Sequence, residues 1–402
     1  MRERAKQLGR EHSARTLVGI RVGVWVAAAF TLLWAPLHSA RAIPPFRAYE
    51  SVTDLLFGTF AQWDSVWFVH IADHGYDSKQ IAAFFPLYPL VVHGVAIVLR
   101  STIVAGVLVS LAAGAVAAGV LVRLARPLLG PESSRDAILY VALYPIAYVF
   151  TAVYSDGLFL ALAAGSFLAA RERRSVLAGV LGGLAVATRI VGLALLPALV
   201  VLLWPRRRSL VEYARLLPLA LLPAALGAYA LYLSHRFGDA LAFVHAQGSV
   251  DWNRHVPTLG PLQGFWDAAS AGWHGLLELV RHLPRSQNAP HGFLPHDQWA
   301  SWNVLQFALL LVAFWLTVEA WRRLGPAFGL YSTATILIFL SSPAAFVPLV
   351  SEPRFLLSDF PLFLVLARMT QRRPRLRQAV IVAFAVVGGF AAVGFARKVW
   401  IA

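Results

Sequence analysis

The chain has 402 residues, of which 58% are hydrophobic and only 14% are charged, and its mean hydropathy is +0.65. An ordinary soluble domain carries about a quarter charged residues, so this composition excludes a water-soluble enzyme or nucleic-acid module and predicts an all-α polytopic membrane protein. The sequence has no cysteine, which excludes disulfides, thiolate metal sites and cysteine nucleophiles.

Apolar runs long enough for a membrane helix recur along the chain. A helix needs roughly 20 mostly apolar residues to cross the hydrocarbon core. The first run lacks a small-residue cleavage site and is too long for a signal peptide, so none is expected. The uninterrupted runs lie at about 17–37, 84–100, 102–122, 216–234, 302–320, 326–341 and 379–396.

Two further apolar runs are longer than one span and are interrupted. The run 137–170 contains Pro145 and the polar trio Tyr154-Ser155-Asp156, and the run 175–204 is broken at Thr188-Arg189. Another short run follows Arg354. We therefore predict about 10 or 11 transmembrane helices in a single membrane domain over 1–402.

The formal charge of +15 comes from arginine clusters that abut the ends of apolar runs. The positive-inside rule places such clusters on the cytoplasmic face. They are interpreted as topology signals, so no nucleic-acid partner is expected. Keeping Arg100 and Arg171 both cytoplasmic, with one span at 137–170, places the segment 123–135 on the far side. The clusters lie at 2–21, 171–174, 206–208, 322–323 and 368–377.

With the N-terminus inside, two long polar loops fall on the extracytoplasmic side of the membrane. The first covers about 38–83 and the second about 235–300, and both are rich in Trp, His, Asp and Pro. Because polar residues concentrate on this face of an otherwise apolar protein, we expect the functional site there.

The first outer loop contains a short helical pattern. Trp63, Trp67, His70 and His74 are spaced by four, three and four residues, which places them on one face of a helix. The stretch is too polar to span a membrane but suits a helix that lies in the interface with aromatic residues at headgroup level. Gly75 is expected to end this helix.

The residues alone leave two interpretations of Asp64. It can be a helix cap or a solvated loop carboxylate, or it can be a general base partly desolvated by Trp63 and Trp67. His70 and His74 at i, i+4 could bind a metal, but no third ligand stands out nearby, and no closely spaced carboxylate pair accompanies Asp64. We expect neither a metal nor a cofactor.

Four segments resemble the PIG-V family, the second mannosyltransferase of glycosylphosphatidylinositol synthesis, and its bacterial relatives. The resemblance covers most of residues 60–365 in order, and its first motif is the specific one. Asp156 departs from the pattern, because the family usually has Glu there. The segments are Gln62-Trp63-Asp64-x3-Phe68-x2-Ile71-Ala72-x2-Gly75-Tyr76 with Phe84-Phe85-Pro86-Leu87-Tyr88-Pro89, then Tyr154-Ser155-Asp156, Ala187-Thr188-Arg189-x2-Gly192-Leu193 and Glu352-Pro353-Arg354-Phe355-Leu356.

This resemblance implies a GT-C glycosyltransferase fold with interfacial helices in the first outer loop. It implies inverting transfer of mannose from a polyprenyl-phosphate-mannose donor to a hydroxyl of a lipid-linked or exported glycan acceptor. The functional acid of the family's first outer loop matches Asp64. The enzyme would sit in a bacterial plasma membrane among membrane lipids, with its active site on the extracytoplasmic side.

A leaving phosphate needs cations, for which arginine is suited. Arg189, Arg354 and Arg254 lie away from the cytoplasmic clusters and are the candidates for the donor phosphate, with Lys79 behind them. Arg189 interrupts an apolar stretch, where an unpaired charge costs several kcal/mol. A structural ion pair of Arg189 with Asp156 or Glu352 is an equal alternative, and Arg254 can simply be a solvated loop residue.

Substrate contacts are expected from aromatic and polar residues near these groups, although interfacial anchoring explains Trp equally well. A polytopic transporter of a lipid-linked or small polar substrate is the alternative function, but the internal repeat expected of one is not evident. A non-catalytic assembly subunit is a further alternative, disfavoured by the acid at position 64. The predicted substrate-binding residues are Trp63, Trp67, His74, Tyr154, Asp156 and Glu352.

Overall fold

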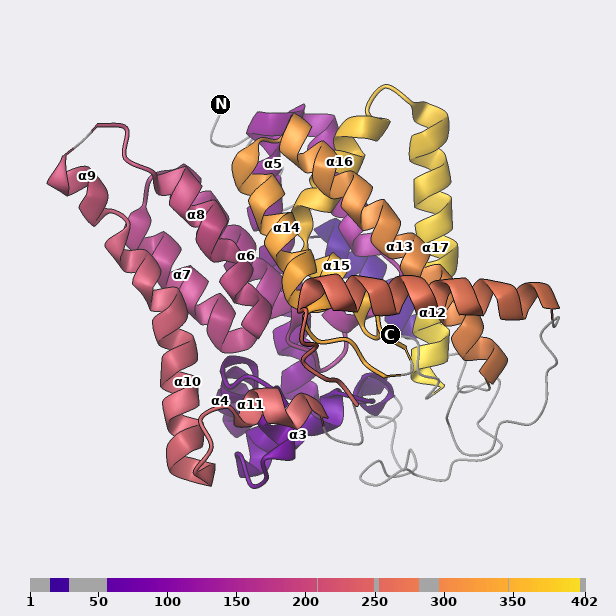
Figure 1. The fold of residues 1–402 in the computed structure, drawn as a ribbon, viewed down its shortest axis with the longest axis horizontal. Coiled ribbons are helices and arrows are strands. Elements are labelled where there is room, and N and C mark those ends of the chain that lie inside the picture. Colours follow the sequence, from indigo (N-terminus) through magenta and orange to yellow (C-terminus); the bar gives the residue numbers. More distant parts are fainter. Residues whose placement is uncertain are drawn as a thin grey trace.

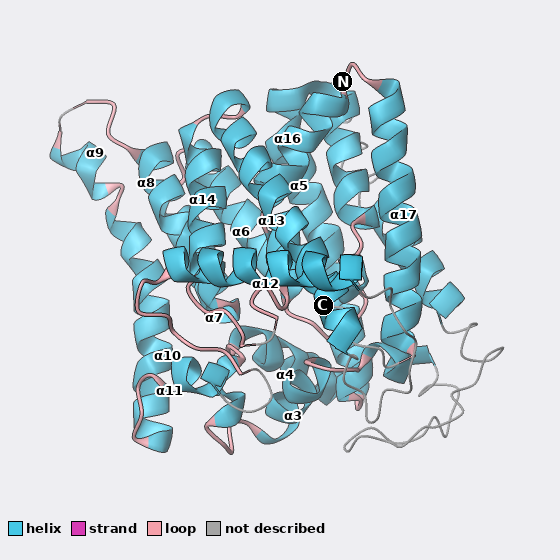
Figure 2. Cartoon of the chain, turned by 45° about the vertical axis from the view of Figure 1, so that its right-hand side comes forward, coloured by secondary structure: helices cyan, strands magenta, loops and turns pink. Residues whose placement is uncertain are grey.

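The computed structural model describes residues 15–28, 56–207, 209–248, 253–281, 296–345 and 347–397, and within these ranges its regular elements are helices (Figure 1, Figure 2). The predicted all-α class is confirmed. The α-helices are α3 (Ser65–His74), α4 (Leu87–Leu99), α5 (Thr102–Leu143), α6 (Asp156–Arg171), α7 (Ser175–Thr188), α8 (Leu195–Leu203), α9 (Leu210–Ala214), α10 (Leu221–Phe237), α11 (Ala242–His245), α12 (Pro261–Arg281), α13 (His296–Arg323), α14 (Pro326–Leu340), α15 (Glu352–Ser358), α16 (Phe360–Thr370) and α17 (Pro374–Ala396).

Four helical segments of the described chain are long and apolar enough to cross a membrane, so the protein is an integral membrane protein. They are Thr102–Leu143, Leu210–Phe237, Trp299–Arg323 and Pro374–Ala396. Other apolar helices are shorter. The span predicted at 84–100 is α4, whose 13 residues extend only about 20 Å, less than the roughly 30 Å of a hydrocarbon core.

Arginines from distant segments meet at one end of the bundle. Arg123 pairs with Glu172 at 3.0 Å, and Arg173 pairs with Glu212 at 2.9 Å. Arg368 donates to the carbonyl of Leu128 at 2.9 Å. We call this the arginine-rich end. The clusters at 171–174 and 368–377 therefore share this end, as predicted, whereas residues 2–14 and Arg208 of the other clusters lie outside the described residues.

The placement of 123–135 on the far side is wrong. Arg123 binds Glu172, and Arg377 forms a two-point pair with Asp136, so both ends of this segment lie at the arginine-rich end. The helix of α5 is kinked at Gly130, which has a positive φ of 80°, so the chain reverses there. Arg100, which we expected on the cytoplasmic face, instead adjoins Thr102, whose hydroxyl bonds Asp73 in the first outer loop.

The physical reason for this error is that 137–170 is not one span. Residues 137–143 complete α5, a short 3-10 helix follows at Ala147–Phe150, and α6 begins only at Asp156. Pro145 and the polar trio thus mark a reversal of the chain rather than a defect within a helix. That extra reversal brings 123–135 back to the side of Arg171.

Three hairpins enter the bundle from the arginine-rich end, and their apices carry the polar residues singled out in the sequence. The first joins α5 to α6 through 144–155, and the second joins α7 to α8 through Arg189 and Ile190–Ala194. The third joins α14 to α16 through 341–359. The second closes at its base because Arg173 donates to the carbonyls of Leu202 and Trp204 at 3.1 Å.

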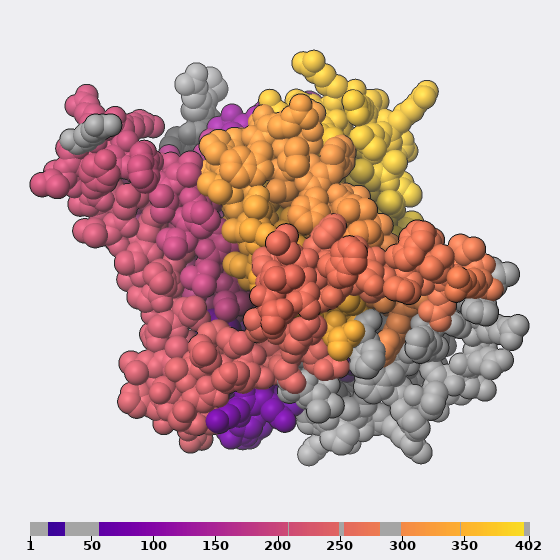
Figure 3. All heavy atoms as spheres, in the orientation of Figure 1, coloured from indigo at the N-terminus to yellow at the C-terminus, as the bar shows by residue number. Residues whose placement is uncertain are grey.

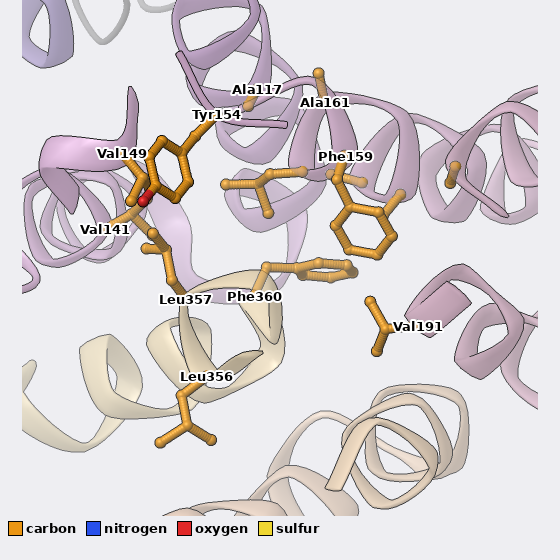
Figure 4. Close-up of a cluster of buried hydrophobic side chains, with 14 of the residues drawn as sticks. Ala117, Val141, Val149, Tyr154, Phe159, Ala161, Val191, Leu356, Leu357 and Phe360 are labelled. Atoms are coloured by element: carbon orange, nitrogen blue, oxygen red, sulfur yellow. The ribbon is translucent and has the colours of Figure 1, made fainter. Parts of the chain in front are cut away.

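Apolar side chains from all three apices form one buried cluster (Figure 4). Tyr154 and Phe159 come from the first hairpin, Val191 from the second, and Leu357 and Phe360 from the third. Between helices in a membrane, van der Waals packing rather than removal from water stabilises such contacts. The cluster therefore fixes the three apices against one another, although the helices leading to them are short.

Candidate active site

Asp64 lies where the first outer loop meets the three apices. It is the N-cap residue of α3, and its backbone carbonyl accepts from the N–H groups of Trp67 and Phe68. Its side chain makes no capping hydrogen bond and is 25% exposed. The carboxylate is thus available for another partner. As expected, Gly75 ends the helix, with a φ of 74°.

One part of the helix prediction is wrong. Trp63 is not on the helical face with Trp67, because α3 begins at Ser65 and Trp63 has a left-handed φ of 56°. A non-glycine residue in this region costs of order 1–3 kcal/mol and is held only when its surroundings impose it. The His70 and His74 rings do share a face, with centroids 4.9 Å apart.

A chain of alternating charges connects the loop to the hairpins. Arg354 donates one Nη2–H to Asp156 Oδ2 at 3.1 Å and another N–H to Asp64. Asp156 also accepts from Arg189 through its second oxygen. Burying any of these charges alone would cost several kcal/mol, so the alternation of two arginines and two carboxylates is what makes the cluster stable.

Arg354 is the centre of this cluster. Its guanidinium lies over the Tyr154 ring, with the carbon 4.5 Å from the ring centroid, a favourable cation–π arrangement. The side chain is only 10% exposed, and its Nε has no hydrogen-bond partner among the described residues. The guanidinium therefore keeps one buried donor that the described part of the chain leaves unpaired.

Arg189 extends the cluster at the second apex. Its Nη1 reaches Ser358 Oγ at 3.4 Å, and its guanidinium lies 5.2 Å from the Phe355 ring centroid and 5.7 Å from that of Phe159. The pairing with Asp156 that we considered from the sequence is present. The predicted contact of Arg189 with a donor phosphate stays a prediction.

Arg254 holds the loop that leads to Arg354. Its Nη1 donates to the Ser342 carbonyl at 2.7 Å and its Nη2 to the Val350 carbonyl at 2.6 Å. Burial lowers the pKa of Arg254 to about 10, while the nearby Asp64 charge opposes that shift. Because two donor nitrogens are occupied by the chain itself, Arg254 serves the site here by fixing the 342–350 loop. Its predicted phosphate contact stays a prediction.

The other predicted binding residues lie at different depths. The Trp67 ring stacks on Phe84 at 6.5 Å between centroids. His74 is exposed at the far end of α3 from Asp64, about 15 Å along the helix. Glu352 is fully buried, and neither of its carboxylate oxygens has a partner among the described residues. The indole N–H of Trp63 is likewise buried without a partner there.

The described residues add no third metal ligand to the pair of His70 and His74. The Nε2 of His70 lies 2.7 Å from Asp77 Oδ2, and this hydrogen bond lowers the pKa of that exposed carboxyl. Across the ranges that the structure describes, no group of three histidines or carboxylates is arranged to hold a metal ion.

Sequence reasoning missed three features beside the cluster. Ser358 bonds Arg189, and buried Asp359 accepts from Ser332 Oγ at 2.6 Å. Ser351, directly before Glu352, has a left-handed φ of 67°. Ser358 and Asp359 are visible in the sequence as a polar pair within an apolar run. The left-handed backbone of Ser351 has no sequence signal, because serine adopts the common right-handed and extended conformations equally well.

The site thus combines the partly exposed Asp64 carboxylate, the buried Arg354 guanidinium that binds two carboxylates, and the unpartnered N–H donors of Arg354 Nε and the Trp63 indole. It lies at the boundary between the first outer loop and an apolar bundle. Comparisons with curated proteins and with solved structures gave no match. Residues 18–208 match the family model described as Mannosyltransferase (PIG-V). This span includes Asp64, Asp156 and Arg189 with the motifs around them. Over these residues, just under half of its length, the chain is similar to the PIG-V mannosyltransferase family.

Proposed function

We propose that the enzyme is an inverting GT-C mannosyltransferase. It transfers mannose from a polyprenyl-phosphate-mannose donor to a hydroxyl of a lipid-linked or exported glycan, on the non-cytoplasmic face. The observation that carries this proposal is the contact of Arg354 with Asp64 and Asp156. A base and a phosphate-binding cation are the two groups that this reaction needs.

The donor phosphate competes with Asp64 for Arg354. A phosphodiester bound to the Nη1 side of the guanidinium takes over the hydrogen bond that Nη1 donates to Asp64. Nη1 carries two N–H bonds in the guanidinium plane, so it can donate to the phosphate while Nη2 keeps its bond to Asp156. Asp156 keeps Arg354 and Arg189 in place, because it bonds both.

Asp64 then acts as the general base. The acceptor hydroxyl oxygen attacks the anomeric carbon while Asp64 takes the hydroxyl proton. The bond from that carbon to the phosphate oxygen breaks, and polyprenyl phosphate leaves with the electron pair. Arg354 and Arg189 stabilise the additional negative charge on the leaving phosphate. A single displacement of this kind inverts the anomeric configuration.

The position of the site suits two substrates of opposite character. Asp64 belongs to the polar loop and is 25% exposed, whereas Asp156 is 1% exposed among apolar hairpins. A hydrophilic acceptor approaches Asp64 from water. The polyprenyl tail of the donor remains in lipid beside the short helices, and no nucleic acid is involved.

The test is mannosyl transfer by purified protein in vesicles that contain labelled polyprenyl-phosphate-mannose and a membrane glycolipid extract. Asp64→Asn keeps the size of the side chain but removes the base, so transfer should fall by about 10²–10⁴-fold. Asp77→Asn, an exposed carboxylate of the same loop, is the matched control and should retain activity.

Three outcomes contradict the proposal. Asp64→Asn can retain the full transfer rate, which removes the base. A product with the donor's anomeric configuration removes the single displacement. Movement of labelled mannose into vesicles without a glycosidic product, unaffected by Asp64→Asn, favours transport instead.

A further inference from the structure

Helix α12 carries three separate stripes of side chains. At 100° per residue, its exposed apolar residues fall together, its polar residues fall to one side of them, and its small residues fall to the other. The apolar stripe is Leu262, Trp266, Trp273, Leu276 and Val280. The polar stripe is Gln263, Asp267, Ser270, His274, Glu278 and Arg281. The small stripe is Gly264, Ala268, Gly272 and Gly275.

The small stripe faces the bundle. A Cβ added at Gly264 would collide with the Leu340 carbonyl at 1.9 Å, and one at Gly275 with the Ala300 carbonyl at 2.5 Å. Leu340 ends α14, and Ala300 lies near the start of α13. Both are the helix ends remote from Arg323. Helix α12 is therefore seated against the bundle at the boundary of its apolar part, away from the arginine-rich end.

The axis of α12 lies crosswise to the long apolar helices. It crosses the front of the bundle while α10 and α17 stand upright, and both ribbon views agree on this (Figure 1, Figure 2). The space-filling view shows its outer surface open on that face (Figure 3). Leu262 is 77% exposed, Trp266 71% and Val280 76%. Such apolar exposure in water would be costly.

We propose that α12 lies in the membrane plane, with its apolar stripe inserted at the boundary between headgroups and acyl chains on the side remote from the arginine-rich end. A helix with one apolar and one polar stripe along its whole length takes this position. Trp266 and Trp273 supply the aromatic anchors typical of that depth. The lipid surface is the occupant, because the exposed stripe is apolar along the whole helix and runs crosswise to the upright apolar helices α10 and α17.

The inserted helix also sets the membrane depth of the loop that precedes α15 and Arg354. The segment before α12 pairs with the loop before α15. The His255 N–H donates to the Pro343 carbonyl, and the Ala345 N–H donates to Asn253, both at 3.1 Å. Arg254 grips the same loop through two carbonyls. A helix fixed at the lipid boundary thus holds the loop before α15, and with it Arg354, at that boundary.

The absence of cysteine from the chain allows a direct test by single-cysteine spin labelling. Leu262→Cys and Val280→Cys place nitroxides at the two ends of the apolar stripe, and His274→Cys is the matched control on the exposed polar stripe. The full chain is reconstituted in phosphatidylcholine–phosphatidylglycerol vesicles. Collision of each label with oxygen, which concentrates in lipid, is compared with collision with a water-soluble nickel complex.

The labels at 262 and 280 should favour oxygen severalfold over the label at 274, and they should agree with each other in depth. Equal nickel access at all three positions would place the helix in water and overturn the proposal. Shielding of 262 and 280 from both reagents would mean that protein covers the stripe, and unequal depths would mean that the helix is not in the membrane plane. Unlabelled variants with unchanged thermal unfolding show that the fold is intact, and no outcome depends on mannosyl transfer.

Discussion

The guanidinium of Arg354 binds one carboxylate from the outer loop and one from a hairpin apex, Asp64 and Asp156. Its geometry explains why arginine is needed. A planar fork presents several donors at fixed angles, whereas the ammonium of lysine is a compact point charge. The sequence identified both acids and the cation but not their contact. Residues this distant along the chain meet only because α15 and α6 pack together.

Replacing Arg354 with lysine tests whether the planar guanidinium, and not only its positive charge, is needed. Arg354→Lys keeps a positive charge but loses bidentate binding, and a hydrogen bond to a charged group is worth about 1.5–3 kcal/mol. We expect mannosyl transfer to fall about 10- to 100-fold, mainly through a higher KM for the lipid donor. Arg372→Lys, an exposed arginine of the arginine-rich end, is the control. Unchanged donor kinetics in Arg354→Lys would contradict the phosphate role.

Asp156 should matter for stability as well as for activity. Asp156→Asn removes the one carboxylate that both Arg189 and Arg354 share, and breaking a buried pair costs about 3–5 kcal/mol. Thermal unfolding in detergent should therefore show a large loss of stability. Glu172→Gln breaks only the partly exposed pairs with Arg123 and Arg174 and should change stability by about 1 kcal/mol or less. Equal effects of the two changes would show that the Asp156 cluster is not a structural charge network.

The helices of the three hairpins are mostly too short to be stable alone. Close contacts between their backbones stabilise them. Gly192 is the clearest case. A Cβ there would lie 2.6 Å from the Val186 nitrogen and 2.8 Å from the Ala185 carbonyl carbon. This contact closes the turn between α7 and α8 that presents Arg189. The glycine was visible in the motif, but its role depends on how the two helices pack.

Gly192→Ala should destabilise the protein by about 1–3 kcal/mol, because neighbouring backbone must move. It should also lower mannosyl transfer by displacing Arg189. Gly227→Ala is the matched control, since a Cβ at that helical position meets open space and should be neutral or stabilising by up to about 1 kcal/mol. Thermal unfolding and transfer rates of the two variants decide between these expectations. An unaffected Gly192→Ala protein would show that the turn adjusts freely.

For the whole molecule, membrane sidedness follows from which arginines share an end. The structure brings 123–135 to the same end as Arg173 and Arg368 and leaves the first outer loop at the other. The positive-inside rule then predicts that the arginine-rich end is cytoplasmic. This arrangement satisfies the charge rule at 123–135, which the one-span interpretation of 137–170 violated.

Single-cysteine labelling with a membrane-impermeant maleimide tests the sidedness. Glu132→Cys should react only in inverted vesicles, together with the reference Arg372→Cys. Gln80→Cys, in the first outer loop, should react in right-side-out vesicles instead. All three positions are exposed, so burial does not limit the reaction. Labelling of Glu132→Cys from the same side as Gln80→Cys would restore the original placement and contradict the packing at Arg123.

The sequence by itself determined the membrane class, the helical fold, the catalytic candidates and the family resemblance. These depend on composition, on local spacing and on short motifs, which are properties of neighbouring residues. Only the tertiary structure decided that the 137–170 run turns back at its polar trio, that Trp63 leaves the helix, and that Arg254 holds a loop. The physical reason is that a polar interruption in an apolar run fits both a kinked span and a hairpin apex. Which one forms depends on whether buried charges such as Asp156 and Arg354 find partners from distant segments.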